Sequence, residues 1–417
     1  MIYDGSRPQP QLTTPDGSIN VEWLSEQLGA CVTAVCPLFH DKLGGLSGSF
    51  CFVAATLTNG KVLKLALKTV PANHLERSAK LGNAREALFY KELGASLEDT
   101  VPHVYYAQGD MESGESVVLM ECLEGSLPCG VLYGPGNPNN WSIKDNLLAM
   151  SAGRPSAEQA SADAFKLYAR LHGSYWNDTS LFAKSWLRGA AWFQGQGEST
   201  WRDAMQMASD AWQQLSDARA EGRSNIAWDE HLVACLQASF GKVSEGKGWV
   251  AQQEELATRP FTLVHGDCHP HNVLLVEPCH TRRVQAGSDD GQADHPRLCL
   301  VDFEMVGIGS GAQELGQFLI SHMEVACRRA CERRLVQAYH AELVATLRAR
   351  GLHEAADRYG IDECWAEYVA GGAGRWAWFV AYLGCKMPAL AQFFHDQLAA
   401  FLHDHVPDPA NVPMPRV

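Results

Sequence analysis

The stretch LVHGDCHPHN (Leu263–Asn272) holds three histidines, a cysteine, an aspartate and an asparagine within ten residues. Such a concentration of reactive side chains admits three interpretations: a metal cage, a thiol nucleophile, or a catalytic loop built on the aspartate. Spacing separates them. Asn272 follows Asp267 by five residues, and the apolar run VLLVEP (Val273–Pro278) begins directly after it. A loop that ends in a buried β run is the expected setting for polar side chains that must be held in place.

A second apolar run, LCLVDFEMVG (Leu298–Gly307), carries another acidic residue, Asp302, near its end. The D-x-x-x-x-N spacing, followed by an aspartate at the end of a later β run, is typical of phosphotransferases. In that chemistry the first carboxylate accepts the proton of an attacking hydroxyl. The asparagine and the second aspartate hold a divalent metal that bridges the phosphates. The spacing therefore predicts Asp267 as the base and Asn272 and Asp302 as magnesium ligands.

The other two interpretations of the stretch are weaker. A zinc site made of Cys268, His269 and His271 is too crowded, because tetrahedral ligands are usually separated by longer gaps. Cys268 as a nucleophile needs a dedicated base, and the sequence indicates none beyond its immediate neighbours. His265 and His269 are expected to hydrogen-bond the loop rather than to take part in catalysis.

The N-terminal third reads as short β runs around one helix. The runs SFCFVAATL (Ser49–Leu57) and KVLKLALKTV (Lys61–Val70) are joined by Thr58–Gly60, a hairpin signal. Residues Ser78–Gly94 follow with helical spacing, weakened by a glycine in the first turn. The segment SVVLMECL (Ser116–Leu123) predicts another buried strand.

These elements carry a second set of functional residues. Lys68 lies at the end of its strand, and Glu86 comes 18 residues later in the predicted helix. A strand lysine paired with a helix glutamate positions the α- and β-phosphates in kinases. Lys64, on the same face of the strand, is the alternative lysine. Backbone groups complete the predicted nucleotide site, near phosphate in the glycine-rich turn and near adenine after the last strand: Gly45, Ser47, Gly48, Ser49, Glu121 and Leu123.

Beyond Glu124–Trp141, a segment rich in glycine, proline and asparagine that suits a hinge, helical patterns dominate. In Ala162–Trp176 the apolar residues fall on one helical face. A chain of 417 residues is long for one core. We therefore expect an N-terminal nucleotide-binding lobe with a short extension, residues 1–123, and a C-terminal catalytic and acceptor-binding lobe, residues 124–417.

Composition excludes several classes of function. The net charge is −14 and no run of lysine and arginine stands out, so a nucleic-acid or anionic-membrane surface is not expected. No apolar run reaches the roughly 18 residues that span a bilayer. The N-terminus lacks the basic and apolar regions of a signal peptide. Thirteen cysteines without a paired framework indicate a reducing compartment, so we expect a cytoplasmic protein.

Taken in order, these motifs resemble the aminoglycoside phosphotransferase and choline-kinase-like superfamily, and within it the CHK-type kinases that include the ecdysteroid kinases. The matching segments are GGLSGS (Gly44–Ser49), LALKTVP (Leu65–Pro71), REALFYKEL (Arg85–Leu93), ARLHGSYW (Ala169–Trp176), HGDCHPHNVLL (His265–Leu275) and LVDFE (Leu300–Glu304). The resemblance implies an α+β, protein-kinase-like fold with a β-rich N-terminal lobe and a mainly helical C-terminal lobe. It also implies ATP and Mg²⁺ as cofactors, and transfer of the γ-phosphate to a small-molecule hydroxyl of amino-alcohol, sugar-like or sterol-like type.

The sequence departs from the family pattern where an aspartate before leucine usually braces the catalytic loop, since Glu314 stands there. Two other functions stay open. A protein kinase is disfavoured because His269 replaces the usual lysine and only nine residues separate Glu304 from Glu314, too few for a peptide-binding activation segment. A catalytically inactive nucleotide-binding pseudokinase would normally have lost the lysine, base or metal ligands, all of which are present here.

Overall fold

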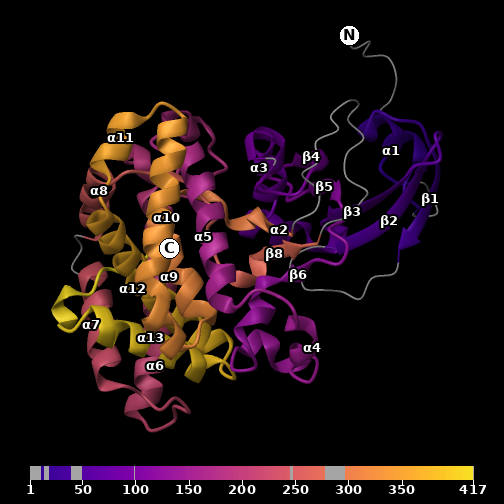
Figure 1. Ribbon diagram of the computed structural model, residues 1–417. Helices are drawn as coiled ribbons and strands as arrows, with labels where there is room; N and C mark the ends of the chain where they lie inside the picture. Colours follow the sequence, from indigo (N-terminus) through magenta and orange to yellow (C-terminus); the bar gives the residue numbers. More distant parts are fainter. Residues whose placement is uncertain are drawn as a thin grey trace. The chain divides into compact units, whose positions relative to one another are not determined.

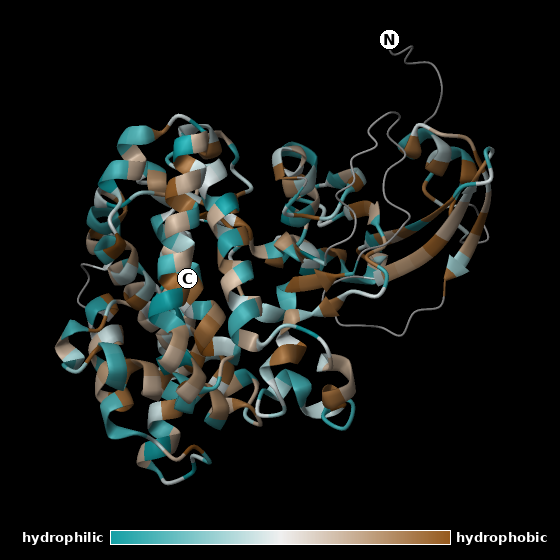
Figure 2. Cartoon of the chain, in the orientation of Figure 1, coloured by the Kyte–Doolittle hydropathy of each residue, from teal (hydrophilic) through white to brown (hydrophobic). Residues whose placement is uncertain are grey.

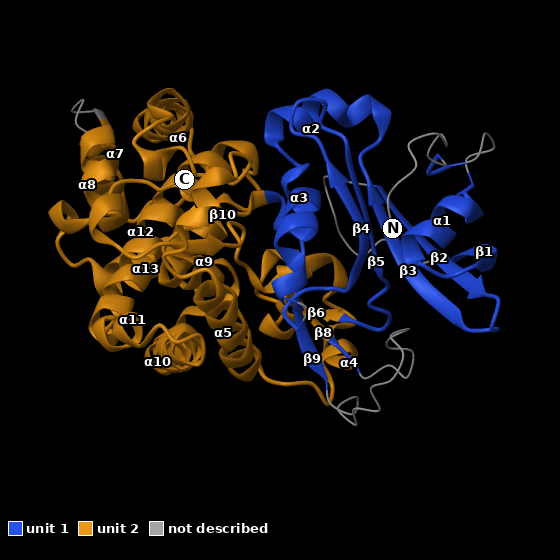
Figure 3. Cartoon of the chain, turned by 90° about the horizontal axis from the view of Figure 1, so that it is seen from above, with its two compact units in different colours: residues 1–126, 276–304 blue, residues 127–275, 305–417 orange. Residues whose placement is uncertain are grey.

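The computed structural model describes residues 11–13, 18–38, 49–97, 99–244, 248–277 and 296–416. The chain divides into two compact units, which Figure 3 shows in different colours. The first unit comprises residues 1–126 and 276–304, and the second comprises residues 127–275 and 305–417. The first boundary lies close to the expected division at residue 123. Residues 276–304, expected in the C-terminal lobe, lie with the first unit instead.

An antiparallel sheet of five strands forms the centre of the first unit, in the order β1-β2-β3-β5-β4 (Figure 1). The strands are β1 (Val32–Leu38), β2 (Ser49–Leu57), β3 (Val62–Thr69), β4 (Val104–Gly109) and β5 (Ser116–Glu121). The helices of this unit are α1 (Val21–Leu28), α2 (Leu75–Leu81) and α3 (Arg85–Glu92). A short strand, β9 (Arg297–Leu300), comes from the distant segment of the chain.

The β2–β3 hairpin predicted from two apolar runs joined by Thr58–Gly60 is confirmed, with Ser49 opposite Thr69 and Thr56 opposite Val62. Its inner residues are buried in a core with Trp23 and Leu24 of α1. In Figure 2 the long strands of this unit carry much of the brown that marks hydrophobic residues. In β2 buried residues alternate with half-buried ones from Phe52 to Leu57, and β3 is buried from Leu65 to Lys68, so both strands appear in the sequence as apolar runs.

The single helix expected over Ser78–Gly94 is wrong in one respect, because the structure has two helices there. Gly82 ends α2 with a left-handed backbone (φ 73°), and its N–H donates to the carbonyls of Ser78 and Ala79. Glycine adopts this conformation at little cost and commonly ends helices in this way. The chain then begins a separate helix, α3, at Arg85.

The distant segment of the first unit packs against α3. Phe303 stacks on Phe89 with ring centroids 3.9 Å apart, and both rings are fully buried. The Leu300 N–H donates to the Thr100 carbonyl at 2.8 Å. These contacts fix the position of Asp302 relative to α3, although more than 200 residues of sequence separate them.

The second unit is mainly helical, so the predicted α+β class with a β-rich N-terminal part and a helical C-terminal part is confirmed. Its helices are α4 (Leu147–Ser151), α5 (Ala157–Ser174), α6 (Glu198–Ala220), α7 (Glu230–Ser244), α8 (Gly248–Thr258), α9 (Gly311–His322), α10 (Val325–Ala349), α11 (His353–Arg358), α12 (Ile361–Lys386) and α13 (Ala391–His405). Its strands are β6 (Leu127–Pro128), β7 (Thr262–Val264), β8 (Val273–Val276) and β10 (Gly307–Gly309). Within the described residues, none of these helices has the length and apolar surface required to span a bilayer.

Helices α9 and α12 approach each other unusually closely. A Cβ atom on Gly316 would lie 2.5 Å from the Cα of Gly372, and one on Gly371 would lie 2.3 Å from the Cα of Gln313. Either added atom would overlap backbone, so only glycine fits at these positions. The close approach places polar residues of both helices beside the loop that follows β7.

Candidate active site

Four charged side chains meet in the first unit. The Nζ atom of Lys68, on β3, lies 2.6 Å from Glu86 Oε2, 3.1 Å from Asp302 Oδ1 and 3.0 Å from Glu304 Oε1. Lys68 is 9% exposed and Glu86 only 3%. The structure therefore joins three residues that the sequence predicted to act together and adds Glu304 to them.

This group carries an excess of negative charge. Burial alone would lower the pKa of Lys68, but the carboxylates of Glu86, Asp302 and Glu304 raise it well above its usual value. Burial and the two neighbouring carboxylates raise the pKa of Glu86 to about 7, against the opposing effect of Lys68. The three carboxylates offer oxygen atoms within 4.8 Å of one another. Such a set suits a divalent cation that prefers oxygen ligands.

The backbone at Asp302 is strained, with φ at 67°. Aspartate tolerates this left-handed conformation better than most residues, but the conformation is uncommon outside glycine. Residues held in such conformations concentrate at functional sites, where the surrounding structure imposes them. Here the adjacent Phe303 stacks on Phe89 of α3, and the Asp302 carboxylate lies 3.1 Å from Lys68.

The loop after β7, in the second unit, holds Asp267 and Asn272. The Asn272 side-chain N–H donates to the Asp267 carbonyl at 3.0 Å and to its carboxylate at 3.3 Å. A carbonyl accepts only from a donor, so the amide nitrogen must face Asp267 and the amide oxygen must face away. That oxygen is the atom a metal ion would use. Gln317 of α9 donates to the other carboxylate oxygen of Asp267 at 3.2 Å.

Positive groups keep Asp267 ionised. Burial alone would raise its pKa, but His269, His265 and Arg375 bring it well below the usual range. His269 Nε2 lies 3.4 Å from the carboxylate, which is about one-third exposed. The carboxylate is therefore ionised and can accept a hydrogen bond from a hydroxyl group.

Glu314 of α9 holds this loop in place through hydrogen bonds to its backbone. Its carboxylate accepts the His265 N–H at 2.8 Å, the Gly266 N–H at 2.6 Å and a bond from His172 at 3.0 Å. Gly266 has a left-handed backbone, and a Cβ there would lie 1.9 Å from the Met305 carbonyl. The glutamate thus holds the backbone N–H groups of the two residues before Asp267.

Replacing Glu314 is expected to destabilise the protein. In Glu314→Gln the buried N–H groups of His265 and Gly266 lose a charged acceptor. The new side-chain amide also places an N–H donor beside groups that are themselves donors. We expect the free energy of unfolding in urea to fall by about 3 kcal/mol or more. The control is Glu354→Gln on α11, whose exposed pair with Arg358 should contribute no more than about 0.5 kcal/mol.

The loss of stability in Glu314→Gln should also depend on pH. Burial would raise the pKa of Glu314, but the bonds from His172 and the neighbouring positive groups lower it. A carboxylate whose folded-state pKa is depressed stabilises the fold above its unfolded-state pKa and loses that contribution as the pH falls. The difference between wild type and Glu314→Gln should therefore shrink below about pH 4. Equal stability of Glu314→Gln and Glu354→Gln at neutral pH would show that the brace contributes nothing.

The structure does not support Cys268 as a nucleophile or as a ligand in a zinc site with His269 and His271, the two other interpretations of the stretch. Cys268 is fully buried, and burial raises the pKa of its thiol well above the usual value. Among the described residues, His269 and His271 lie instead with His322 of α9, and the ring nitrogens of these three side chains, within 4.8 Å of one another, could hold a metal ion. His271 Nδ1 lies 2.7 Å from His322 Nε2, and burial with the neighbouring His269 lowers the pKa of His271 to about 4. This ring is therefore neutral at physiological pH.

A cavity of about 130 Å³ opens beside Asp267, within the second unit. We call it the Asp267 pocket. Its polar wall includes Asp267, His269 and Asn139, and its apolar wall includes Trp376 and Phe394, whose ring centroids are 5.4 Å apart. An apolar wall facing a carboxylate suits a small molecule with a hydroxyl at one end.

Of the other residues predicted to contact the nucleotide, Ser49, Glu121 and Leu123 lie in the described part of the chain. Gly45, Ser47 and Gly48 lie outside the described residues, and Ser49 is exposed at the start of β2. The Glu121 N–H donates to the His103 carbonyl at 2.8 Å, and its side chain accepts from Arg297. That backbone groups of Glu121 and Leu123 contact adenine stays a prediction.

Four residues at these sites were not predicted: Glu304, Gln317, Arg375 and His172. Gln317 lies one helical turn after Glu314, so helical spacing could have indicated it. Arg375 donates to the Gly266 carbonyl at 3.2 Å from α12, and nothing in its local sequence signals that contact.

Comparison with known proteins supports the resemblance drawn from the motifs. Residues 179–352 match the ecdysteroid kinase-like family, a match that includes the Leu263–Asn272 stretch and Asp302 but covers less than half of the chain. The resemblance to that family is confirmed over these residues. No curated protein gives a significant match to the sequence.

Several solved structures resemble the chain weakly. They include the ethanolamine kinase of Plasmodium vivax, with 11% identity, a TM-score of 0.41, and coverage of 89% of this chain and 82% of that one. A microcompartment-associated aminopropanol kinase has 11% identity, a TM-score of 0.42, and coverage of 94% and 99%. A choline/ethanolamine kinase family protein of Mesorhizobium loti has 17% identity, a TM-score of 0.31, and coverage of 87% and 91%. Scores of this size carry no argument about function, for which the site residues and the family match are the stronger guides.

Proposed function

We propose that this protein is an ATP-dependent phosphotransferase that moves the γ-phosphate to a hydroxyl group of a small molecule. The observation that carries the proposal is the position of Lys68, which bonds both Glu86 and Asp302 although they lie 18 and 234 residues away in the sequence. A buried lysine held between a helix glutamate and the aspartate of a D-F-x motif is the arrangement that positions phosphates in kinases. The match of residues 179–352 to the ecdysteroid kinase-like family agrees with this function.

Each side chain has a proposed role. Lys68, held by Glu86, would bind the α- and β-phosphates of the nucleotide. Backbone groups of Glu121 and Leu123 would contact the adenine. Asp267 would accept the hydrogen bond of the acceptor hydroxyl and then its proton, while Asn272 and Gln317 hold the carboxylate in one orientation. Holding both reactants in line is the main source of rate in phosphoryl transfer, because the transition state requires little covalent help.

The residues present fit magnesium. Asp302 and Glu304 supply carboxylate oxygens close together in the first unit, and the amide oxygen of Asn272 faces away from Asp267. We propose Asp302 and Asn272 as the metal ligands. Magnesium, when bound, neutralises negative charge on the phosphate oxygens.

The Asp267 pocket favours a small acceptor. Its volume of about 130 Å³ is below the roughly 300–1,000 Å³ of sites for drug-sized ligands. Trp376, Phe379 and Phe394 line it, and aromatic faces attract alkyl groups and ammonium ions alike. Of the three acceptor types, an amino-alcohol fits this space better than a sugar-like or sterol-like molecule.

The test is a screen of alcohols and amino-alcohols for ADP release by the full chain, with and without magnesium. We expect at least one amino-alcohol to stimulate ADP release, and we expect the stimulation to require magnesium. Asp302→Asn should abolish the activity or raise the magnesium requirement, because a metal ligand is lost. Arg170→Gln, at an exposed ion pair on α5, is the matched control and should behave as wild type does.

The pseudokinase alternative makes a different prediction for the same screen. For a pseudokinase, calorimetry would detect ATP binding, but no acceptor would stimulate ADP release. Activity that is independent of magnesium and unaffected by Asp302→Asn would contradict the proposed chemistry.

A further inference from the structure

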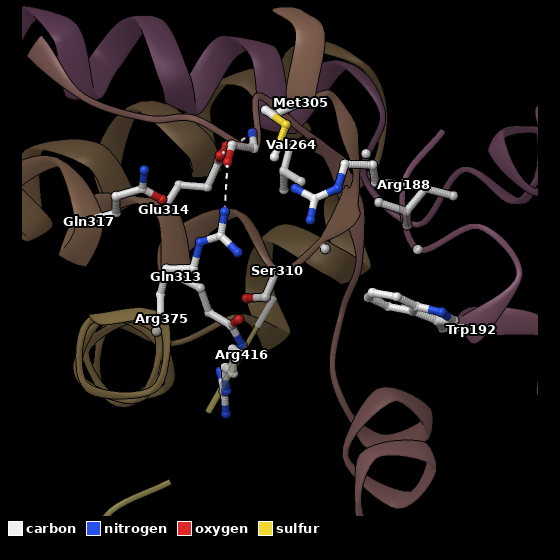
Figure 4. A pocket seen from close by; sticks show the side chains of 16 residues that line it. Arg188, Trp192, Val264, Met305, Ser310, Gln313, Glu314, Gln317, Arg375 and Arg416 are labelled. Atoms are coloured by element: carbon white, nitrogen blue, oxygen red, sulfur yellow. Dashed lines mark hydrogen bonds between the residues drawn. The ribbon is translucent and has the colours of Figure 1, made fainter. Parts of the chain in front are cut away.

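A second cavity, of about 100 Å³, lies within the second unit and is lined by Gly266, the residue before the proposed base. Figure 4 shows it with the guanidinium groups of Arg188 and Arg375 turned toward the same space and Arg416 approaching from the C-terminal segment. We call it the arginine pocket. The Asp267 pocket does not include any of these three arginines among its described lining residues.

Arginines outnumber carboxylates among the described residues that line the arginine pocket. Among its described lining residues, three arginines face one carboxylate, that of Glu314. Both oxygens of Glu314 already accept bonds from His265, Gly266 and His172. This local excess contrasts with the net charge of −14 of the whole chain.

Two of the guanidinium groups have buried donors without a hydrogen-bond partner in the described part of the chain. The Nη1 atoms of both Arg375 and Arg416 are in this state. Arg375 donates to the Gly266 carbonyl at 3.2 Å through its other terminal nitrogen, and its guanidinium lies 4.5 Å from the ring centre of Phe379. Arg416 pairs with Glu255, and its side chain is 12% exposed.

Buried charged donors without partners are costly, and native structures rarely leave them so. Burial lowers the pKa values of Arg375 and Arg416 to about 10, so both stay charged at neutral pH. A guanidinium in this position is satisfied best by an oxyanion, whose oxygens accept several N–H bonds at once.

We propose that the arginine pocket binds a small oxyanion, of phosphate or carboxylate type, through Arg375 and Arg416 with Arg188 on the opposite wall. A volume of about 100 Å³ holds a group the size of phosphate, since a single water needs only roughly 10–15 Å³ by the same measure. The anion could come from two sources: free phosphate, or an acidic group carried by the acceptor. In both cases Arg375 connects the anion to the Gly266 carbonyl, next to the proposed base.

The test is direct and does not require catalytic activity. Inorganic phosphate is titrated into the full chain by calorimetry, without nucleotide or magnesium. Wild type is expected to bind one phosphate per chain. Arg375→Gln and Arg416→Gln should each weaken binding by about 10- to 100-fold, because a charged hydrogen bond is lost.

Two control variants locate the binding. Arg329→Gln, at an exposed pair with Asp404 on α10, should bind phosphate as wild type does. Lys64→Ala, at an exposed pair with Glu124 in the first unit, should also bind it unchanged. Thermal unfolding of each variant confirms that it is folded, and Arg416→Lys keeps the charge if Arg416→Gln fails to fold.

The outcomes are distinct. If phosphate competes with an acceptor found in the screen, the anion is part of the acceptor. If phosphate and the acceptor bind at the same time, the anion is a separate effector. Both results support the site. Lack of phosphate binding by folded wild type would overturn the proposal. So would binding that is retained in both arginine variants.

Discussion

The Asp267→Asn variant is expected to bind ATP about as tightly as wild type and to transfer phosphate roughly 10²–10⁴-fold more slowly, the usual contribution of a positioned acid or base. Asparagine keeps the size of the side chain but cannot accept the proton of the acceptor hydroxyl. It also removes a negative charge, so repulsion of the nucleotide phosphates cannot increase. The two measurements are nucleotide affinity by calorimetry and transfer to the acceptor found in the screen.

The structure indicates how the variant should fold. Asn272 and Gln317 each donate to one carboxylate oxygen of Asp267, and an amide can still accept one of these two bonds. The loop is also held by Glu314, which accepts the backbone N–H groups of the two residues before Asp267. Asp357→Asn, at an exposed pair on α11, is the matched control. Joint loss of ATP binding and transfer in Asp267→Asn would instead assign Asp267 a structural role.

Lys68→Ala is expected to reduce turnover by about 10²–10³-fold, the effect of removing one preorganised charged donor from a reaction site. The amine of Lys68 is held by three carboxylates within 3.1 Å, so its position is fixed before nucleotide arrives. Its removal also leaves Glu86, Asp302 and Glu304 without their shared cation. We therefore expect the variant to be less stable as well, and a folded sample must be shown by thermal unfolding before kinetics are compared.

The matched control for this variant lies four residues away on the same strand. Lys64 pairs with Glu124, and both side chains are more than one-third exposed. Lys64→Ala should therefore leave turnover unchanged. Lys68→Met, which fills the same volume without the charge, should lose activity as Lys68→Ala does. If Lys68→Met and Lys68→Ala keep full turnover while Lys64→Ala loses it, the phosphate-binding lysine has been misassigned.

The parts of the fold that the sequence predicted well are those in which burial and local pattern agree. The β2–β3 hairpin and the apolar face of α5 follow from periodicity, because both elements bury one continuous set of side chains. The break at Gly82 was underestimated, because a glycine inside a helical pattern only lowers helix propensity, whereas a left-handed glycine ends the helix.

The candidate site likewise contains residues that local sequence pattern indicates and residues that depend on tertiary packing. Motif spacing alone indicated Asp267, Asn272 and Asp302, because a tight loop and a strand end fix where such side chains point. Arg375 could not be predicted, since its contact with Gly266 depends on the close approach of α9 and α12. Contacts that depend on how two helices pack leave no mark in the sequence near either residue.

The assignment of residues 276–304 to the first unit has a consequence for how this protein could be recombined with its relatives. The chain passes from one unit to the other at residues 126/127, 275/276 and 304/305. A fragment that stops at residue 126 would lack Asp302, Glu304 and the Phe303 ring that covers Phe89. Of its three carboxylate partners, Lys68 would keep Glu86. Exchange of the first unit between two related chains therefore requires two DNA segments to be inherited together, and a single crossover near residue 126 would separate Lys68 from Asp302.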